Sequence, residues 1–182
     1  MSRRDQILAT AAELFATHGY HGVSVADLGA ACGISGPALY KHFPSKQAVL
    51  AEMLVAISEE LLRVGTERVA AAAGPRPALT ALVDWHVDFA LRHRALIVVQ
   101  DRDWEALPQE ARERVRTLQR EYVDLWAGQL RLDDPGLDLA TVRSMAHAAF
   151  GLINSTPHSG LLPDTAMRDL LSRMALGALD VG

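Results

Sequence analysis

Apolar residues recur every three or four positions along most of the chain, which is the spacing of one face of an α-helix. In the first such stretch the apolar positions include Ile7, Ala11 and Phe15. No stretch sustains the strict alternation of apolar and polar residues that indicates a β-strand. Gly, Pro and helix-capping residues divide the pattern into predicted helices over residues 3–17, 24–33, 35–44, 45–74, 77–93, 95–103, 108–130, 138–155 and 163–179. The sequence therefore predicts an all-α fold.

The second and third predicted helices are short and are separated by a turn that contains Gly33. Ser24 precedes the second helix and Ser35 the third, where a hydroxyl accepts a hydrogen bond from a first-turn amide. Pro37 falls in the first turn of the third helix, where a missing N–H costs nothing, and Pro44 ends that helix. Two short helices joined by a glycine-containing turn are typical of a helix-turn-helix, whose second helix reads the major groove of DNA.

The third predicted helix has distinct inner and outer faces. Leu39 and Phe43 are four residues apart, so they share a face and are expected to point inward. Tyrosine, histidine and lysine on the opposite face suit phosphate oxygens, and Lys46 adds a cation at the start of the next helix, where amides favour an anion. The spacing also fits a solvated edge of a small three-helix bundle. The residues expected on the outside are Gly36, Pro37, Tyr40 and Lys41, with His42 beside them.

The charge balance limits where a DNA-binding surface can lie. The chain of 182 residues has a net charge of −4, so attraction of a polyanion to the whole protein is excluded and a local patch is needed. The only two lysines, Lys41 and Lys46, both lie in the predicted helix-turn-helix region. Residues 1–50 hold four basic and three acidic side chains, a net charge of +1, so the remainder sums to −5. The N-terminal segment is therefore favoured.

Several features favour a cytoplasmic protein without membrane contact. The apolar runs are far shorter than the roughly 18 residues that a membrane crossing needs. The N-terminus lacks the small-residue cleavage site of a signal peptide. The single cysteine, Cys32, allows no intramolecular disulfide, which fits a reducing compartment.

The stretch from Ile7 to Leu54 contains an Ala-Ala-x-Leu-Phe run in its first helix, a Gly-Tyr pair, a Ser-capped second helix and the ending Tyr-x-His-Phe-x-Ser-Lys. By these motifs it resembles the N-terminal DNA-binding domain of TetR-family transcriptional regulators. Pro37 stands where that family commonly has Thr or Ser, and proline lacks the hydroxyl that would bond a base edge. The resemblance implies a DNA surface formed by Ser24, Ser35, Gly36, Pro37, Tyr40, Lys41, His42 and Lys46.

The same resemblance implies two domains. Residues 1–46 would form the helix-turn-helix DNA-binding domain, and residues 47–182 a helical ligand-binding and dimerisation domain. Such regulators form homodimers through their last two long helices. The apolar, Ala-rich stripes of the last two predicted helices suit close packing across a two-fold axis, although the stripes alone equally describe an intrachain core.

The sequence contains no convincing catalytic or metal-binding constellation. His18 and His21 have a His-x-x-His spacing, but no third ligand lies nearby. Ser155, His158 and Ser159 lack the strand-to-helix elbow and the third member of a catalytic triad. There is no glycine-rich phosphate loop. We therefore expect a non-enzymatic protein without a cofactor or a metal.

The C-terminal helices carry aromatic residues together with a few polar groups, which is the usual composition of a small-molecule site. Each of these residues taken singly is more often part of a hydrophobic core. As a set they predict a pocket for a mainly apolar effector with a carboxylate or thioester head. The candidate ligand-binding residues are Trp85, His86, Phe89, Arg102, Trp104, Tyr122, Trp126, His147, Phe150 and Asn154.

These observations lead to a functional hypothesis and one alternative. The hypothesis is a dimeric transcriptional repressor that binds an inverted-repeat operator in double-stranded DNA and is released by a small-molecule inducer. The predicted helix over residues 45–74 would then link the DNA-binding domain to the pocket. The alternative is a helical DNA-binding module that is unregulated, or controlled by a protein partner, and has no small-molecule pocket.

Overall fold

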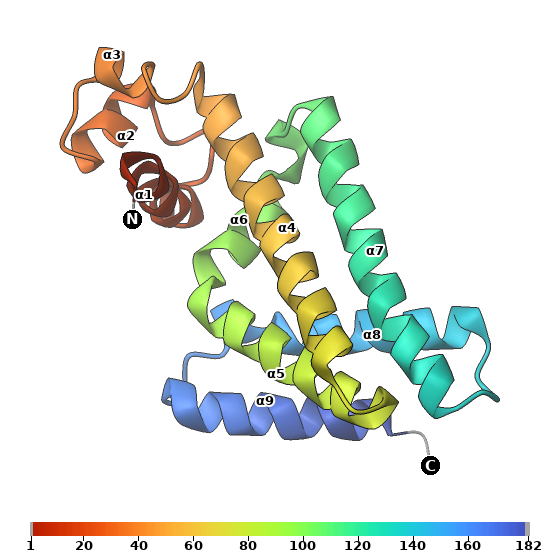
Figure 1. The fold of residues 1–182 in the computed structure, drawn as a ribbon. Coiled ribbons are helices and arrows are strands. Elements are labelled where there is room, and N and C mark those ends of the chain that lie inside the picture. Colours follow the sequence, from red (N-terminus) through yellow and green to blue (C-terminus); the bar gives the residue numbers. More distant parts are fainter. Residues whose placement is uncertain (1, 181–182) are drawn as a thin grey trace. The chain divides into compact units, whose positions relative to one another are not determined.

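The computed structural model describes residues 2–180, and these residues form helices joined by turns, without a strand (Figure 1). The prediction of an all-α fold is confirmed. The elements in chain order are α1 (Arg3–His18), α2 (Val25–Ala31), α3 (Gly36–Leu39), α4 (Lys46–Ala71), α5 (Pro75–Arg92), α6 (Arg94–Asp103), the 3₁₀ turn η1 (Trp104–Ala106), α7 (Gln109–Asp133), α8 (Leu139–Ile153), the 3₁₀ turn η2 (Thr156–His158) and α9 (Asp164–Leu179).

The largest difference from the predicted helix boundaries concerns the third helix, which ends at Leu39 and does not continue to Pro44. Beyond Leu39 the chain turns more tightly: the His42 amide donates to the Leu39 carbonyl at 2.9 Å, three residues back. Phe43 precedes Pro44, and the residue before a proline is disfavoured in helical geometry. The α3 helix is therefore a single short turn.

The chain divides into two compact units, each built from two segments. Unit 1 contains the chain up to Ile57 together with Ala95–Arg116. Unit 2 contains Ser58–Arg94 and the chain from Thr117 onward. Unit 1 therefore adds α6, η1 and the start of α7 to the N-terminal helices, a grouping that the order of the sequence does not reveal.

Unit 1 has a hydrophobic core formed by side chains from its two segments. Phe15 of α1, Leu28 of α2 and Phe43 after α3 are almost completely buried, together with Val99 of α6 and Val115 of α7. Burying a side chain of this size contributes about 1.5–3 kcal/mol relative to leaving it exposed. The inward orientation predicted for Leu39 and Phe43 is confirmed, since these side chains are 2% and 1% exposed.

Unit 2 is built around α5, whose inner face is buried over most of its length. The α9 helix packs against both α5 and α8 (Figure 1). Trp85 of α5 donates its indole N–H to the Leu61 carbonyl of α4 at 3.0 Å. Gly65 of α4 lies so close to α7 that a Cβ atom placed on it would be 2.8 Å from Cε2 of Tyr122. The absence of a side chain at Gly65 allows this close approach.

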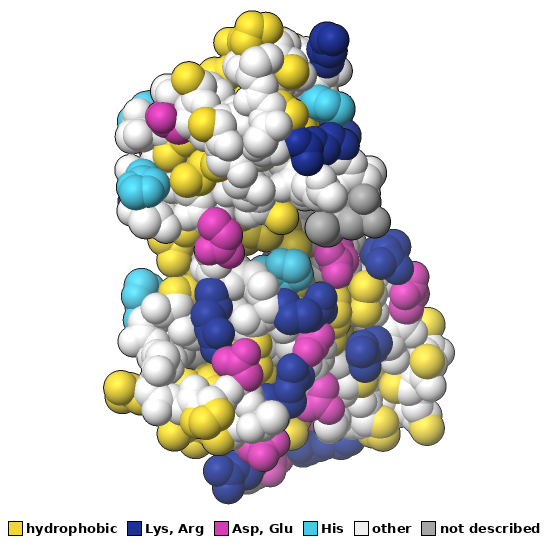
Figure 2. Space-filling model, turned by 90° about the vertical axis from the view of Figure 1, so that its left-hand side faces the viewer, with side chains coloured by type: hydrophobic (Ala, Val, Ile, Leu, Met, Phe, Trp, Pro, Cys, Tyr) yellow, Lys and Arg dark blue, Asp and Glu magenta, His cyan; other side chains and the backbone are white. Residues whose placement is uncertain are grey.

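Ion pairs cover the outer surface of α5 and α9. Arg168 of α9 contacts Asp88 of α5 at 2.6 Å, and Asp88 also pairs with Arg92 at 2.8 Å. On the face drawn in Figure 2, Lys and Arg side chains (dark blue) are interspersed with Asp and Glu side chains (magenta). Partly exposed pairs of this kind contribute little each, because water screens them.

Candidate functional site

The helix-turn-helix of unit 1 is held in shape by capping side chains. Ser24 accepts a hydrogen bond from the Asp27 amide at 3.1 Å, and the Asp27 carboxylate accepts one from the Ser24 amide at 2.8 Å. The Ser24 hydroxyl also donates to the Asp27 carboxylate at 2.6 Å. This bond and the one from the Ser24 amide lower the pKa of Asp27, so its charge stays at the N-terminus of α2, where a negative charge is favoured. Ser35 accepts from the Ala38 amide at 3.3 Å. The predicted capping roles of Ser24 and Ser35 are confirmed.

A close approach of backbone segments sets the turn between α2 and α3. A Cβ atom at Gly29 would lie 2.8 Å from the carbonyl oxygen of Ile34, so only glycine allows this separation. Gly33 in the turn has a positive φ of 66°, which glycine adopts without strain. These two glycines determine how α3 leaves α2.

The α3 helix presents its polar side outward while Leu39 anchors it in the core. Tyr40 is 54% exposed, which is high for an aromatic side chain. Ser24, Ser35, Pro37 and Lys41 are also exposed, whereas Gly36, His42 and Lys46 are half-buried. The exposed members form a surface with a tyrosine, a lysine and hydroxyl groups available to a partner.

The two lysines of this region have different surroundings. The Lys46 ammonium donates to the carbonyl oxygens of Tyr20 and Val23, both at 2.7 Å, and lies 4.2 Å from the centroid of the Tyr20 ring. It thereby holds the turn between α1 and α2 against the start of α4. Lys41, two residues beyond the end of α3, is exposed.

Sequence reasoning missed a second cationic contact in unit 1. Arg4 of α1 forms an ion pair with Glu52 of α4, donates to the His42 carbonyl, and lies 4.1 Å from the centroid of the Phe43 ring. The Arg-Arg pair at the N-terminus is visible in the sequence, but its partner is 48 residues away.

Two of the residues predicted to bind a ligand have their described contacts within unit 1. Arg102 of α6 donates to the carbonyl oxygens of Phe15 and Ala16 at the end of α1, and also contacts Asp103. Trp104 packs against the unit 1 core, with the Arg116 guanidinium 5.4 Å from its ring centroid. Neither residue belongs to the aromatic cluster of unit 2.

Unit 2 contains a compact cluster of rings contributed by α5, α7 and α8. The His86 ring centroid lies 4.8 Å from that of Phe150, 5.6 Å from Tyr122 and 6.0 Å from Trp126. Phe89 joins the cluster at 6.2 Å from His86. We call these five residues the His86 cluster. The structure thus brings together half of the residues predicted to bind a ligand.

Asn154 is the nearest polar partner of the cluster. Its side-chain oxygen lies 3.2 Å from Nε2 of His86. Burial lowers the pKa of His86 to about 4, so the imidazole is neutral at pH 7. Burial also raises the pKa of Tyr122, and the nearby Trp126 indole opposes that rise only in part. The His86 cluster is therefore uncharged.

The remaining two predicted ligand residues lie at the edge of this cluster. His147 is on the exposed side of α8, although its ring contacts Phe150 at 6.2 Å. Trp85 is buried and contacts Phe89 at 5.9 Å, but its indole N–H already has the Leu61 carbonyl as a partner.

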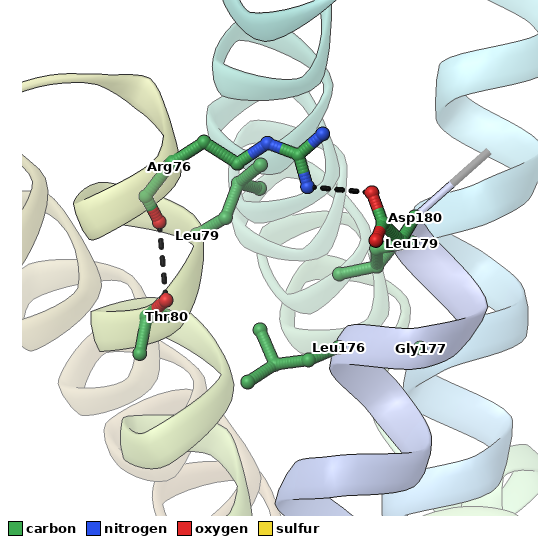
Figure 3. Close-up of a pocket in the computed structure, with 7 residues that line it drawn as sticks. All are labelled: Arg76, Leu79, Thr80, Leu176, Gly177, Leu179 and Asp180. Atoms are coloured by element: carbon green, nitrogen blue, oxygen red, sulfur yellow. Dashed lines mark hydrogen bonds and ion pairs between the residues drawn. The ribbon is translucent and has the colours of Figure 1, made fainter. Parts of the chain in front are cut away.

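A separate surface hollow lies between the start of α5 and the end of α9, with a volume of about 280 Å³ (Figure 3). Leu79 and Leu176 line it, and Arg76 at its rim pairs with Asp180 at 2.8 Å and with Asp133 at 2.6 Å. Because Arg76 already pairs with two carboxylates, its guanidinium is not free to recognise an anion in this hollow.

Two features are missing from the part of the chain that the structure describes. Within residues 2–180, no three side chains of His, Cys, Asp or Glu are grouped so that they could hold a metal ion. Among the helices of this same range, none combines the length and the apolar character that crossing a membrane requires.

Comparison with known proteins identifies both parts of the chain. Residues 7–53 match the model of the tetR family of bacterial regulatory proteins. Residues 72–179 match the model of the tetracyclin repressor-like C-terminal domain. These two matches cover the helix-turn-helix and the helices that contain the His86 cluster.

Individual relatives agree with the family models. The HTH-type transcriptional repressor KstR2 of Rhodococcus jostii is 33% identical over 129 residues, covering 70% of this chain and 63% of the relative. KstR2 of Mycolicibacterium smegmatis is 30% identical over 133 residues, covering 71% of this chain and 64% of the relative. The chain thus matches less than two thirds of the length of these curated relatives.

Solved structures show the same fold. A TetR-family regulator from Bordetella parapertussis has a TM-score of 0.85 and 27% identity, covering 95% of this chain and 93% of that chain. The regulator PfmR from Thermus thermophilus has a TM-score of 0.86 and 24% identity, covering 98% and 96%. With both family models matched, the chain belongs to the TetR family of transcriptional regulators, which are not enzymes.

Proposed function

We propose that this protein is a dimeric transcriptional repressor of the cytoplasm that binds an inverted-repeat operator and is released by a mainly apolar small molecule. The observation that carries the proposal is the outward face of α3, where Tyr40 and Lys41 are exposed while Leu39 is held in the core. A helix presented in this way can enter the major groove of DNA.

The proposed DNA surface comprises exposed and half-buried residues on and around α3. Lys41 and Tyr40 would contact phosphates, and Pro37 would lie nearest the bases at the start of the helix. Lys46 can join them only when its ammonium leaves the carbonyl oxygens of Tyr20 and Val23. The remaining members of the surface are Ser24, Ser35, Gly36 and His42.

The dimer is proposed to form through the outer faces of α8 and α9. Met174 of α9 is 49% exposed, although methionine is usually buried. Gly151 of α8 and Gly177 of α9 have open space where a side chain would be. Small and apolar residues on two packed helices suit a close isologous contact with a second copy. The other exposed residues of this face are Ser144, Ala148 and Ala178.

The effector is proposed to bind at the His86 cluster. Similar solved structures include the ketosteroid transcriptional regulator KstR2 of Mycobacterium tuberculosis, AibR in complex with isovaleryl coenzyme A and operator DNA, and FadR of Bacillus subtilis in complex with stearoyl-CoA. The two acyl-coenzyme A ligands join an apolar acyl chain, short in isovaleryl and long in stearoyl, to a polar head. The aromatic walls of the His86 cluster suit the apolar part of such a molecule.

Release from DNA requires that the effector favour one particular conformation of the dimer. In that conformation the α3 helices of the two subunits are wrongly spaced for the operator. The α4 helix is continuous from Lys46 in unit 1 to Ala71 in unit 2. We propose that a change in α4 transmits effector binding to the helix-turn-helix. The coupling is measured as the ratio of operator affinities with and without the effector.

The test has two steps. First, genomic DNA fragments are selected on the purified protein, and the bound sites are mapped by footprinting. We expect an inverted repeat whose half-site centres are about 34 Å apart, or somewhat more. The variant Tyr40→Ala/Lys41→Ala should lose this binding with an unchanged circular dichroism spectrum, whereas the matched surface variant Arg143→Ala should keep it.

Second, a library of fatty acids, acyl thioesters, alcohols and aromatic compounds is screened by thermal shift and by operator binding. A bound effector stabilises the fold by an amount that grows with its concentration and weakens operator binding. Operator binding that no compound changes, without any thermal shift, would favour an unregulated or protein-controlled DNA-binding module.

A further inference from the structure

Three buried polar atoms in the His86 cluster make no hydrogen bond of acceptable geometry, although the Trp126 indole lies close enough to Tyr122 to oppose the rise in the pKa of that hydroxyl. They are Nδ1 of His86, the hydroxyl oxygen of Tyr122 and Nε1 of Trp126. The three side chains are 2%, 3% and 0% exposed. Leaving a buried polar group without a partner destabilises the fold, so three such groups in one cluster form an incomplete hydrogen-bonding site.

The donors and acceptors of this site can be assigned. With Nε2 of His86 donating to the Asn154 oxygen at 3.2 Å, the neutral ring has Nδ1 as an acceptor that requires a donor. Trp126 is a donor only, and the protonated Tyr122 hydroxyl can donate and accept. A group that both donates and accepts is therefore the complement of the site.

The site contains no charge that could balance an ion. The described ring and hydrogen-bond partners of His86 outside Tyr122 and Trp126 are Phe89, Phe150 and Asn154, all uncharged. Two further imidazoles lie one ring away, with His93 at 4.9 Å from Phe89 and His147 at 6.2 Å from Phe150. Burial lowers the pKa of His93, which disfavours its cation. Two guanidinium groups lie over the ring of Trp85 instead. Their Cζ atoms are 5.9 Å (Arg68) and 5.4 Å (Arg92) from its centroid. A carboxylate buried without a cation loses several kcal/mol of hydration, whereas a neutral group loses much less.

We infer that the effector inserts an uncharged, hydroxyl-bearing end of an apolar skeleton into the His86 cluster. The hydroxyl donates to Nδ1 of His86 and accepts from Tyr122 or Trp126. This inference rests on the proposed function and narrows it, because it selects a neutral alcohol over a carboxylate. The rings of Phe89 and Phe150 contact the carbon skeleton beside the hydroxyl.

The experiment compares three derivatives of each of three skeletons: decyl, decahydronaphthyl and naphthyl. Each skeleton is supplied as the alcohol, the methyl ether and the carboxylate. The alcohol donates and accepts, the ether only accepts, and the carboxylate is an anion. Affinities are measured by quenching of tryptophan fluorescence, and operator release by fluorescence anisotropy. For every skeleton that binds, we expect the alcohol to bind about tenfold more tightly than its ether or carboxylate.

Two variants test the residues themselves. His86→Phe removes the acceptor and should make the alcohol and ether of one skeleton equally weak, whereas Tyr20→Phe in unit 1 should keep the preference for the alcohol. If His86→Phe does not fold, nitrogen NMR of the wild-type protein replaces it. The Nδ1 resonance of His86 should then move upfield with the alcohol and stay in place with the ether.

The outcomes separate this inference from the proposed function. If carboxylates or ethers bind as tightly as alcohols and release the operator, regulation by a small molecule is supported. The proposed role of a hydroxyl group is then wrong. Two results would contradict the binding of the hydroxyl at the His86 cluster. One is that His86→Phe still binds the alcohol more tightly than the ether. The other is that the alcohol does not shift the Nδ1 resonance of His86. If no compound of the panel binds or alters operator binding, both the inference and the small-molecule effector are contradicted.

Discussion

Arg102 Nη1 donates a hydrogen bond of 3.0 Å to the carbonyl oxygen of Ala16, at the C-terminal end of α1. The second terminal nitrogen donates to the Phe15 carbonyl, and the Asp103 carboxylate accepts from Arg102 at 3.1 Å. The Phe15 carbonyl also accepts from the Gly19 amide at 2.8 Å. A cation beside the carbonyls of the last helical turn is favoured by the helix dipole. Arg102 therefore ties α6 to the first helix of the DNA-binding unit.

Replacing Arg102 by alanine should lower the free energy of unfolding by about 1–2 kcal/mol, because two helix-terminal carbonyls lose a charged donor. Part of the side chain is exposed, so water compensates some of the loss. Urea unfolding of Arg102→Ala measures the effect. The matched control is Arg143→Ala, which removes a surface pair with Asp124 and should cost less than about 0.5 kcal/mol. Equal effects of the two substitutions would contradict the role of Arg102.

The two lysines should respond differently to removal of their charge. Lys41→Ala should lower the magnitude of the slope of log K for DNA against log salt by about 0.9 per lost phosphate contact, with unchanged stability. Lys46→Met should lower stability by about 1–3 kcal/mol, because the carbonyls of Tyr20 and Val23 lose their partner. Anisotropy titrations over a range of salt concentrations and urea unfolding measure the two effects. A reduced slope for Lys46→Met at full stability would mean that its ammonium contacts phosphate in the complex.

Two glycines within long helices offer a matched test of packing. Gly65→Ala places a methyl group 2.8 Å from Tyr122 and should destabilise the protein by about 1–3 kcal/mol despite the better helix propensity of alanine. Gly128→Ala in α7 meets nothing within 4 Å and should stabilise by about 0.5–1 kcal/mol. Thermal or urea unfolding of both variants gives the sign of each change in the free energy of unfolding. Stabilisation by both would show that α4 and α7 are not held at this separation.

The proposed dimer face can be tested at Met174 without disturbing the core. Met174→Glu introduces a charge on the outer face of α9 and should give folded monomers, measured by light scattering and circular dichroism. Leu171 is only 4% exposed, so Leu171→Glu should unfold the chain and cannot report on the interface. Leu132→Glu, at an exposed position of α7, is the control and should remain dimeric. A dimeric Met174→Glu variant would place the interface elsewhere.

Stability should depend on pH through His86. Its pKa is about 4 in the folded protein and close to 6.5 when unfolded, so the unfolded chain binds the proton first as the pH falls. The stabilisation is complete above about pH 6.5 and is lost as the pH approaches 4. Between pH 7 and pH 5, wild-type protein should lose about 2 kcal/mol more than His86→Gln. The exposed His147→Gln should behave like wild type, and parallel losses in all three proteins would contradict the prediction.

The helix pattern, the caps at Ser24 and Ser35 and the inward positions of Leu39 and Phe43 were all determined by the sequence itself. Each depends on residues within about four positions of one another, where helix geometry alone decides which side chains share a face. The family could be recognised from the same local motifs. The end of α3 at Leu39 was less predictable, because one turn of helix and a tight turn have similar sequence patterns.

The partners of long polar side chains were decided only by the tertiary structure. Arg102 was expected beside an effector but donates to carbonyls 86 and 87 residues away in the sequence, and Lys46 donates to carbonyls 26 and 23 residues away. Likewise, His86 meets Asn154 across 68 residues. Periodicity places a side chain on one face of a helix, but its partner depends on which distant helix packs against that face. Because buried carbonyls need hydrogen-bond donors, a cation within reach then donates to them.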